Sequence, residues 1–323
     1  MRQSSIIATA LLIFLVSCAT RSLSVSSPAL SIPSPSSPSP TGPSAHPSGT
    51  HSPSATHGTV RRVAVVVMEN RDYSSVIGSS DAPYVNGLAG RYGLATSSYA
   101  VGHPSLPNYL TLLAGSTFGV NSDCTDCTVN ATNLIDQLES AGISWRAYME
   151  DLPSPCFTGA QSDAYAKKHD PFVYFDDIVN DPSRCSNVVP FSQFGGDAAS
   201  GTLPDFIWIT PNLCNDGHDC STAAADAWLA GHIPALVKSL GPGGILFLTW
   251  DEGEGSSGCC GTAAGGHIVT IVAGSGAKSG YTFTTSVDHY SILKTIEELY
   301  GRNPLRGAAC ACTNDLTPLI RSP

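Results

Sequence analysis

Short apolar runs alternate with segments of helical periodicity along most of this chain. The first lies in the segment from Val60 to Met68, where Val63 to Val67 form a continuous run. A continuous run of this kind predicts a central strand that is buried on both faces, as in a parallel sheet. Similar short runs recur at Phe206 to Ile209, Ile245 to Trp250 and Ile268 to Val272.

Three segments between and after these runs carry the apolar spacing of amphipathic helices. They extend from Asn133 to Ala141, from Ala223 to Leu240 and from Tyr290 to Tyr300. Gly142 and Gly301 follow the first and the last of them, where a glycine commonly ends a helix. Strands that alternate with helices predict an α/β sandwich.

Polar side chains follow three of the predicted strands directly. In open α/β sheets, ligands bind beyond the carboxyl ends of the strands. The residues expected at this edge are Glu69, Asn70, Asn212, Asn215, Asp216, His218, Asp251 and Glu252. Each acidic turn alone is as typical of a solvated loop. Oxygen ligands gathered from several strand ends, however, predict a site for a divalent cation.

Ser105 stands between two prolines, just before an apolar helical run. This position at or beside a helix N-terminus allows two roles. The hydroxyl could cap the helix, or the free N–H groups could hold a phosphate while Ser105 serves as a nucleophile. We find no Gly-x-Ser-x-Gly elbow, P-loop or dinucleotide fingerprint, which argues against the enzyme classes that use them.

Composition and the amino-terminal segment indicate an exported protein. The net charge is -10 with 13% charged residues, and without clustered positive charge we expect no nucleic-acid partner. Residues 1–18 are expected to be a signal peptide, because the apolar run from Ile6 to Val16 is too short to span a membrane. The Leu15-Val16-Ser17-Cys18 ending resembles a lipobox, so Cys18 is expected to carry a membrane-anchoring lipid on the bacterial cell surface. An ordinary signal peptide of a secreted protein is the alternative.

Residues 19–58 are rich in Ser and Pro and are expected to form a disordered tether, which leaves 59–323 as one globular domain. The chain has 11 cysteines. Assigning Cys18 to a lipid leaves an even set, expected to form disulfides of unassigned connectivity. A zinc site at Cys124 and Cys127 is a weaker alternative, since no second pair stands at zinc-site spacing.

Six motifs together resemble the bacterial phosphoesterase family of acid phosphatases and phospholipases C, within the alkaline phosphatase superfamily. The resemblance covers Val60 to Gly301. It rests on Met68-Glu69-Asn70-Arg71, His103-Pro104-Ser105-Leu106-Pro107-Asn108-Tyr109, Asn215-Asp216-Gly217-His218-Asp219, Thr249-Trp250-Asp251-Glu252-Gly253, Gly265-Gly266-His267 and Asp288-His289-Tyr290-Ser291. It implies a three-layer α/β/α sandwich with a mostly parallel central sheet.

The resemblance also implies roles for individual residues. A divalent metal ion of the Zn, Ca, Mg, Mn or Fe type would be held by Glu69, Asn70, Ser105, Asp251 and Glu252, and Ser105 would form a phosphoseryl intermediate. Asp216, His218 and His267 would form a second metal subsite or act as histidines that replace that metal. His103 is expected to contact the phosphate or to transfer a proton. Asn108 and His289 are possible substrate contacts, although a structural role is at least as simple for each.

The expected function is that of an exported, metal-dependent phosphoester hydrolase. A phosphomonoesterase is favoured, because no extra carboxyl-terminal domain of the kind found in some phospholipases C is evident. A phospholipase C that acts on phospholipid head groups is the alternative. A non-catalytic solute-binding or adhesion lipoprotein would explain the tether and the cysteines, but not the gathering of Ser105 with carboxylates.

Overall fold

Strand β1 (Val63–Met68) lies in the middle of the main sheet, and all six of its side chains are buried. Alternate side chains enter different cores: Val63, Val65 and Val67 pack on one face of the sheet, whereas Ala64, Val66 and Met68 pack on the other. This is why the run is apolar without interruption. The computed structural model describes residues 62–321, so the predicted signal peptide, Cys18 and the tether lie outside the described residues.

The main sheet has nine strands in the order β10-β2-β9-β8-β1-β7-β3-β6, with β11 paired to β2. Its other strands are β2 (Gly93–Tyr99), β3 (Trp145–Met149), β6 (Val188–Pro190), β7 (Phe206–Thr210), β8 (Ile245–Trp250), β9 (His267–Ala273), β10 (Tyr281–Phe283) and β11 (Val287–Asp288). Only β9 runs antiparallel to its neighbours, β8 and β2, in this described sheet. A separate hairpin joins β4 (Gln161–Ser162) to β5 (Tyr165–Ala166).

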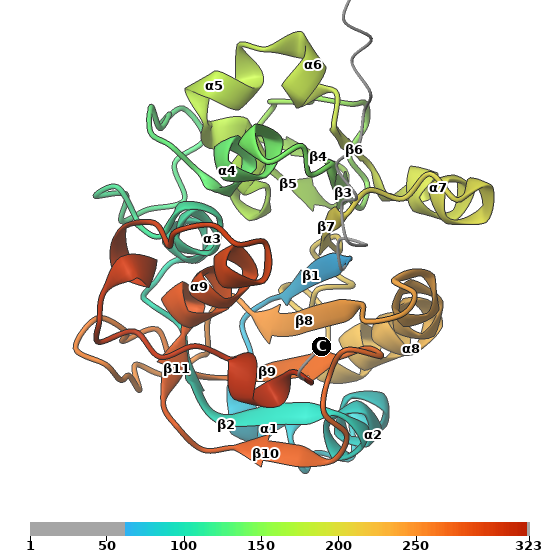
Figure 1. Cartoon of the computed structure of the whole chain (residues 1–323), viewed down its shortest axis with the longest axis vertical. Coiled ribbons are helices and arrows are strands. Elements are labelled where there is room, and N and C mark those ends of the chain that lie inside the picture. Colours follow the sequence, from blue (N-terminus) through green and yellow to red (C-terminus); the bar gives the residue numbers. More distant parts are fainter. Residues whose placement is uncertain (1–61, 322–323) are drawn as a thin grey trace, which may run out of the picture. The chain divides into compact units, whose positions relative to one another are not determined.

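Helices cover both faces of the sheet, as Figure 1 shows. On one face lie α3 (Ser105–Ala114), α4 (Leu134–Ser140) and α9 (His289–Leu299). On the other face lie α2 (Pro83–Arg91) and α8 (Thr222–Ser239). The expected three-layer α/β/α sandwich with a mostly parallel sheet is therefore confirmed.

Short helices fill the connections between these elements. They are α1 (Tyr73–Val76), α5 (Asp176–Val179), α6 (Pro182–Cys185), α7 (Phe194–Ser200), and the 3-10 turns η1 (Lys167–His169), η2 (Pro171–Tyr174), η3 (Phe191–Gln193), η4 (Arg306–Ala309) and η5 (Thr317–Leu319). The four strands and three helices predicted from periodicity are all present. Gly142 and Gly301 follow α4 and α9 in left-handed conformations, with φ of 70° and 64°, and so end these helices as expected.

The ten cysteines of the described domain are all paired. The disulfides join Cys124 to Cys127, Cys156 to Cys185, Cys214 to Cys220, Cys259 to Cys260 and Cys310 to Cys312. Because Cys124 and Cys127 are bonded to each other, they do not offer thiolates to zinc.

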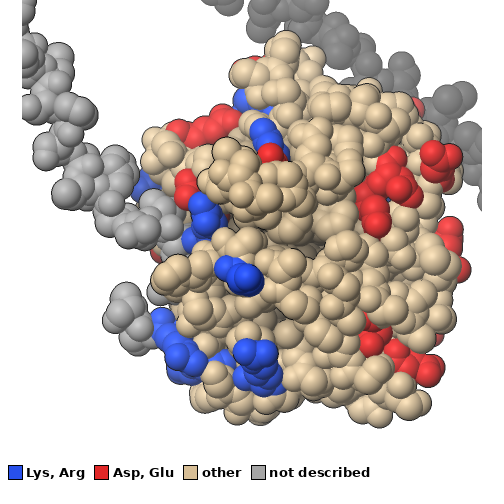
Figure 2. Space-filling model, turned by 90° about the vertical axis from the view of Figure 1, so that its right-hand side faces the viewer, with Lys and Arg blue, Asp and Glu red and all other residues tan. Residues whose placement is uncertain are grey.

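Charged side chains are sparse on the surface near α2 and α8. Figure 2 shows acidic groups toward one side of this face and basic groups toward the other, with mostly uncharged residues between them. Among residues 62–321, no helix combines the length and apolarity needed to cross a membrane.

Candidate active site

The ends of four strands deliver polar residues to one edge of the sheet. Glu69 follows β1, Asp251 follows β8, and the loop after β7 carries Asp216. Backbone hydrogen bonds tie these segments together: the Glu69 N–H donates to the Asp216 carbonyl at 2.9 Å, and the Asp251 N–H donates to that of Met68 at 2.8 Å. The predicted convergence of carboxylates at the sheet edge is therefore present in the structure.

Ser105 reaches the same edge through β2 and is the first residue of α3. Its hydroxyl donates to Glu69 Oε2 at 3.1 Å and also faces Glu252 Oε1 at 3.5 Å. The hydroxyl does not cap its own helix. Instead, Asp123 Oδ1 accepts the N–H of Leu106 in the first turn, at 3.0 Å. Of the two roles left open by the sequence, capping is therefore filled by another residue, and the Ser105 oxygen points at carboxylates.

Glu69 is fully buried and lies against polar side chains from two elements, α3 and η1. Tyr109 Oη, on α3, donates to Glu69 Oε1 at 2.5 Å, while His169 Nε2 lies 3.3 Å from Glu69 Oε2. Burial, reinforced by the charges of Asp251 and Asp216, raises the pKa of Glu69 well above its usual range. An added positive charge would relieve this cost.

Asn70 adopts a left-handed backbone with φ of 52°, a conformation that non-glycine residues adopt mainly where the surroundings impose it. Its N–H donates to Asp251 Oδ1 at 3.1 Å. The second oxygen of Asp251 is buried without a hydrogen-bond partner. Burial and the neighbouring charge of Glu252 raise the pKa of Asp251 to about 8. The backbone turn at Asn70 thus fixes Asp251 with one oxygen free.

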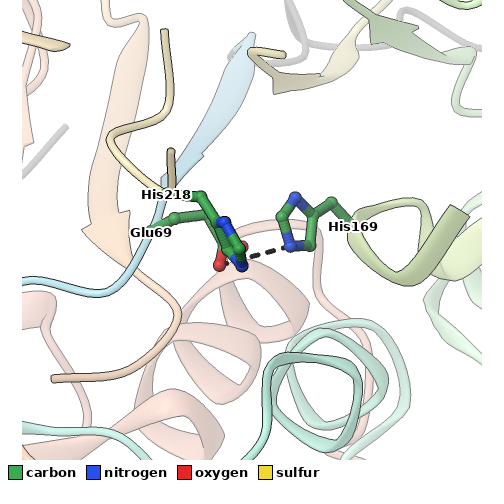
Figure 3. A group of neighbouring side chains, drawn as sticks. All are labelled: Glu69, His169 and His218. Atoms are coloured by element: carbon green, nitrogen blue, oxygen red, sulfur yellow. Dashed lines mark ion pairs between the residues drawn. The ribbon is translucent and has the colours of Figure 1, made fainter. Parts of the chain in front are cut away.

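His169 and His218 complete a second group around Glu69, shown in Figure 3. Potential ligand atoms of Glu69, His169 and His218 all lie within 4.8 Å of one another. His169 Nδ1 lies 3.2 Å from Asp216 Oδ2, an oxygen that is buried without a hydrogen-bond partner. Burial, then the charges of Lys168 and His218, lower the pKa of His169 well below its usual range, so its imidazole is neutral. Neutral imidazoles and carboxylates are suitable metal ligands.

Sequence reasoning missed His169, which lies in η1 rather than after a strand. The rule that ligands follow the carboxyl ends of strands could not find it, because η1 belongs to the long connection between β3 and β7. It missed Tyr109 as well, since an aromatic residue in an apolar helix is usually part of the core. The sequence signal for His169 was the polar triplet Lys167-Lys168-His169. In the structure this triplet is largely buried.

His103 contacts Glu252, which in turn faces Ser105. Its Nδ1 is 2.5 Å from Glu252 Oε2, and its Nε2 is 3.1 Å from the carbonyl oxygen of Gly255. Both ring nitrogens of His103 are therefore engaged by oxygen atoms of the segment that follows β8. The predicted placement of His103 near Ser105 is consistent with this contact.

The three remaining candidate residues, Asn108, His289 and His267, make hydrogen bonds that suggest structural roles. Asn108 accepts the N–H groups of Val101 and Gly102 through Oδ1, at 3.0 Å each, and its amide nitrogen donates to two carbonyls of the same loop. Its side chain is thereby bonded to backbone on both its oxygen and its nitrogen, which is the structural role named as the simpler account. It holds the loop that leads into Ser105.

His289 and His267 also bond to backbone. His289 is fully buried, and its Nε2 donates to the Trp250 carbonyl at 3.1 Å, which supports the strand end before Asp251. Burial lowers the pKa of His289 to about 4. His267 begins β9 at the same sheet edge, but its ring stacks on Tyr73 and its Nε2 bonds to the Thr96 carbonyl at 2.9 Å. His169, rather than His267, is the histidine that lies next to Glu69 and Asp216 in the structure.

The donor set fits a divalent cation. Asp251 and Asp216 each present a buried oxygen without a partner, and the pKa of each carboxyl is raised by burial and by neighbouring carboxylates. Such a cluster is costly unless the groups are neutralised. Hard oxygen donors, with imidazoles beside them, suit divalent ions of the Zn, Ca, Mg or Mn type.

Comparisons of the whole sequence relate this chain to known phosphoester hydrolases. The model of the Phosphoesterase family matches residues 79–302. A phosphatidylinositol-3-phosphatase from Mycobacterium tuberculosis is 37% identical over 247 residues, which are 75% of this chain and 78% of the relative. A probable acid phosphatase from Kluyveromyces lactis and an acid phosphatase from Aspergillus fumigatus are each 30% identical over 73% of this chain. The chain spans 57% and 54% of the length of these two fungal proteins.

Solved structures with the same fold include a protein in the alkaline phosphatase superfamily from Vibrio parahaemolyticus. It has a TM-score of 0.56 at 14% identity, covering 80% of this chain and 70% of that chain. The phosphonate monoester hydrolase of Agrobacterium radiobacter has a TM-score of 0.51 at 13% identity, covering 80% and 77%. These likenesses establish an alkaline-phosphatase-like fold.

Proposed function

Because this chain belongs to the phosphoesterase family, we propose that it is an exported, metal-dependent phosphomonoesterase that uses Ser105 as its nucleophile. The family match and the phosphatase relatives make it a phosphoric ester hydrolase. A non-catalytic lipoprotein is thereby set aside. The nucleophile, the metal requirement and the export are the parts proposed here.

The single observation that carries the proposal is the placement of the Ser105 hydroxyl. It lies at the N-terminus of α3, yet it bonds to Glu69 rather than to its own helix. The dipole of this ten-residue helix favours negative charge at the same end. A serine oxygen in that position is suited to approach a phosphorus atom whose oxygens carry negative charge.

Two neighbouring ligand groups would hold the metal. Glu69, Asn70, Ser105, Asp251 and Glu252 form the first, as the family resemblance implies, and Asp216, His169 and His218 lie beside Glu69 as the second. A divalent cation bound there would neutralise phosphoryl oxygens and lower the pKa of the serine hydroxyl. Whether one ion or two bind is a question for metal analysis of the purified protein.

The chain's own residues would carry out two displacements. Ser105 Oγ would pass its proton to the Glu69 carboxylate, to which it donates a hydrogen bond, and form a bond to phosphorus while the bond from phosphorus to the departing alkoxide oxygen breaks. That alkoxide would take a proton from an imidazole, for which His103 and His218 are the candidates. Water would then attack the phosphoserine and give a proton back to the imidazole. The Oγ–phosphorus bond breaks, inorganic phosphate leaves, and Ser105 takes back its proton from the carboxylate.

Phosphate monoesters are the favoured substrates, since the relatives compared above are named phosphatases. The name of the Mycobacterium tuberculosis relative adds phosphoinositide monoesters to the candidates for this chain. Phospholipase C activity is the alternative. Attachment of the chain to a membrane through Cys18 remains part of the proposal and would place the enzyme near lipid substrates as well as soluble ones.

A substrate panel with metal reconstitution tests the proposal. Aryl phosphate, a nucleotide, phosphatidylcholine and an aryl phosphodiester are each incubated with chelated protein to which single divalent metals are returned. Metal-dependent phosphate release from the monoesters, with a phosphoserine at Ser105 trapped by acid quench, is expected. Near-normal turnover by Ser105→Ala, or turnover by metal-free protein, would refute the nucleophile or the metal requirement, respectively.

A further inference from the structure

The Asp123 carboxylate bridges two groups of the kind that bind phosphate. Its Oδ1 accepts the N–H of Leu106 at 3.0 Å, and its Oδ2 accepts from Lys168 Nζ at 3.2 Å. Leu106 directly follows Ser105 in the first turn of α3. The Asp123 carboxylate therefore accepts both a helix N-terminal N–H and an ammonium group, beside the proposed nucleophile.

Lys168 belongs to the active site by its other contact. Its ammonium donates to His218 Nε2 at 3.0 Å, and His218 Nδ1 lies 2.6 Å from Asp219 Oδ1. Since an ammonium group can only donate, His218 Nε2 is the acceptor of this hydrogen bond. Lys168 thus brings a positive charge to a site that is otherwise lined by carboxylates.

Backbone position places the pair close to the reacting oxygen, because the N–H that Asp123 accepts belongs to the residue directly after Ser105. The side chains of Lys168 and Asp123 remain 21% and 27% exposed. Both side chains are therefore accessible to an anion from solvent, whereas Leu106, whose N–H donates to Asp123, is buried.

The backbone that carries Asp123 is held in place, so that only its side chain has to move. The next residue, Cys124, forms a disulfide with Cys127, and its carbonyl accepts from Tyr174 Oη at 2.9 Å. Lys167 Nζ donates to the Thr125 carbonyl at 2.7 Å. The loop is thereby fixed to η1, which also carries Lys168, and to η2.

We propose that Asp123 occupies the place of a substrate phosphoryl oxygen pair, and that Lys168 and the Leu106 N–H bind the phosphate once Asp123 turns away. The inference rests on the proposed function and deepens it by naming the substrate class. A monoester phosphate carries a second negative charge and a third terminal oxygen, so it competes better against a carboxylate than a diester does. Return of Asp123 to its two donors assists the release of inorganic phosphate.

Two substitutions of opposite expected effect test this exchange. Asp123→Asn removes the competing charge but keeps an oxygen to cap Leu106. It is expected to tighten binding of inorganic phosphate by about fivefold, as for removal of a partly exposed ion pair. Lys168→Met removes the cation and is expected to weaken phosphate binding about tenfold or more. It should also reduce the preference for aryl monoester over aryl diester, with KM changed more than kcat.

The measurements are the Kd of inorganic phosphate by calorimetry on the metal-loaded full chain, and its Ki against an aryl phosphate. Asp126→Asn is the matched control, because Asp126 is an exposed acid of the same loop, and it should leave both constants unchanged. A purely structural Asp123 would give weaker phosphate binding and a lower melting temperature in Asp123→Asn, which overturns the inference. An unchanged Kd in Lys168→Met overturns it as well.

The calorimetric readout separates this inference from the proposed function. Phosphate affinities that shift in the two expected directions support the exchange, even in a protein that hydrolyses no ester. Lack of turnover on every ester of the panel would instead refute the proposed function alone.

Discussion

The N–H of Asn70 donates to one oxygen of Asp251 at 3.1 Å, while the other oxygen of Asp251 is buried without a partner. This pairing fixes the carboxylate and leaves its other oxygen free to bind a cation. Asp251→Asn keeps an oxygen for the Asn70 N–H but removes the charge. We expect metal affinity to fall by at least about 100-fold, since even supporting contacts of a metal site change affinity by about 10- to 100-fold.

Metal content after dialysis against a buffered divalent ion measures the effect of Asp251→Asn. Asp226→Asn is the control, because Asp226 is also buried and accepts backbone N–H groups of Tyr84 and Val85 at 3.0 and 2.8 Å. It should lower stability and leave metal content unchanged. Full metal occupancy in Asp251→Asn would remove Asp251 from the ligand set.

Ser105→Ala is expected to reduce turnover by at least about 10³-fold, as loss of a nucleophile does, and to leave the melting temperature nearly unchanged. The reason is that Asp123, not Ser105, caps the first turn of α3.

Ser221→Ala provides the inverse case, since Ser221 Oγ accepts the Ala224 N–H at 3.2 Å as the cap of α8. That variant should lose about 1 kcal/mol of unfolding free energy and keep its turnover. Steady-state kinetics and thermal melts of both variants test this prediction. Equal losses of melting temperature in the two variants would contradict the conclusion that Ser105 does not cap its helix.

Tyr109→Phe removes the hydroxyl that donates to Glu69 Oε1 at 2.5 Å. We expect metal affinity to fall about 10- to 100-fold, because a supporting hydrogen bond to a ligand is lost. Tyr165→Phe is the control: Tyr165 Oη also donates to a buried carboxylate, that of Asp170, at 3.1 Å. Both variants should be destabilised by about 1–3 kcal/mol, but only Tyr109→Phe should need more metal for half-maximal activity. The same metal requirement in both would place Tyr109 outside the metal site.

The strand-edge argument predicted a large part of this site from sequence. Glu69, Asp216, Asp251 and Glu252 all follow strands whose apolar runs are evident, so parallel strand order was enough to bring them together. Ser105 needed the family resemblance, since its sequence context equally suits a helix cap. His267 lies at the same edge for another reason, because β9 is antiparallel and begins there, and its Nε2 bonds to the Thr96 carbonyl.

What the sequence could not provide were contacts made by connections without periodicity. His169 and Lys168 lie in a 3-10 turn within the long segment between β3 and β7, and the path of such a segment depends on its packing. Asp123 lies in a loop whose disulfide has only three residues of separation. His169 lies against Glu69, and Asp123 and Lys168 bond to each other. Such tertiary contacts are not encoded by local pattern.

Glu297, on α9 and far in sequence from the catalytic candidates, should make stability depend on pH. Its side chain is buried and accepts the Leu305 N–H at 3.0 Å. Burial raises its pKa from 4.5 to about 8, so the folded state binds the proton more tightly than the unfolded state. The resulting stabilisation is complete below pH 4.5 and is lost as the pH rises toward 8, with a slope of at most about 1.4 kcal/mol per pH unit.

Glu297→Gln is neutral at every pH and keeps an oxygen for the Leu305 N–H, so it should lack this dependence. Urea unfolding of both proteins at pH 4.5 and pH 8 should show similar stabilities at the lower pH. At pH 8 the variant should be more stable by on the order of 1–3 kcal/mol. Titration of the metal ligands is common to both proteins and cancels in the difference. Glu298→Gln, at an exposed position of the same helix, should show a much smaller difference. If the gap between wild type and Glu297→Gln stayed constant with pH, Glu297 would not hold its proton more tightly in the folded state.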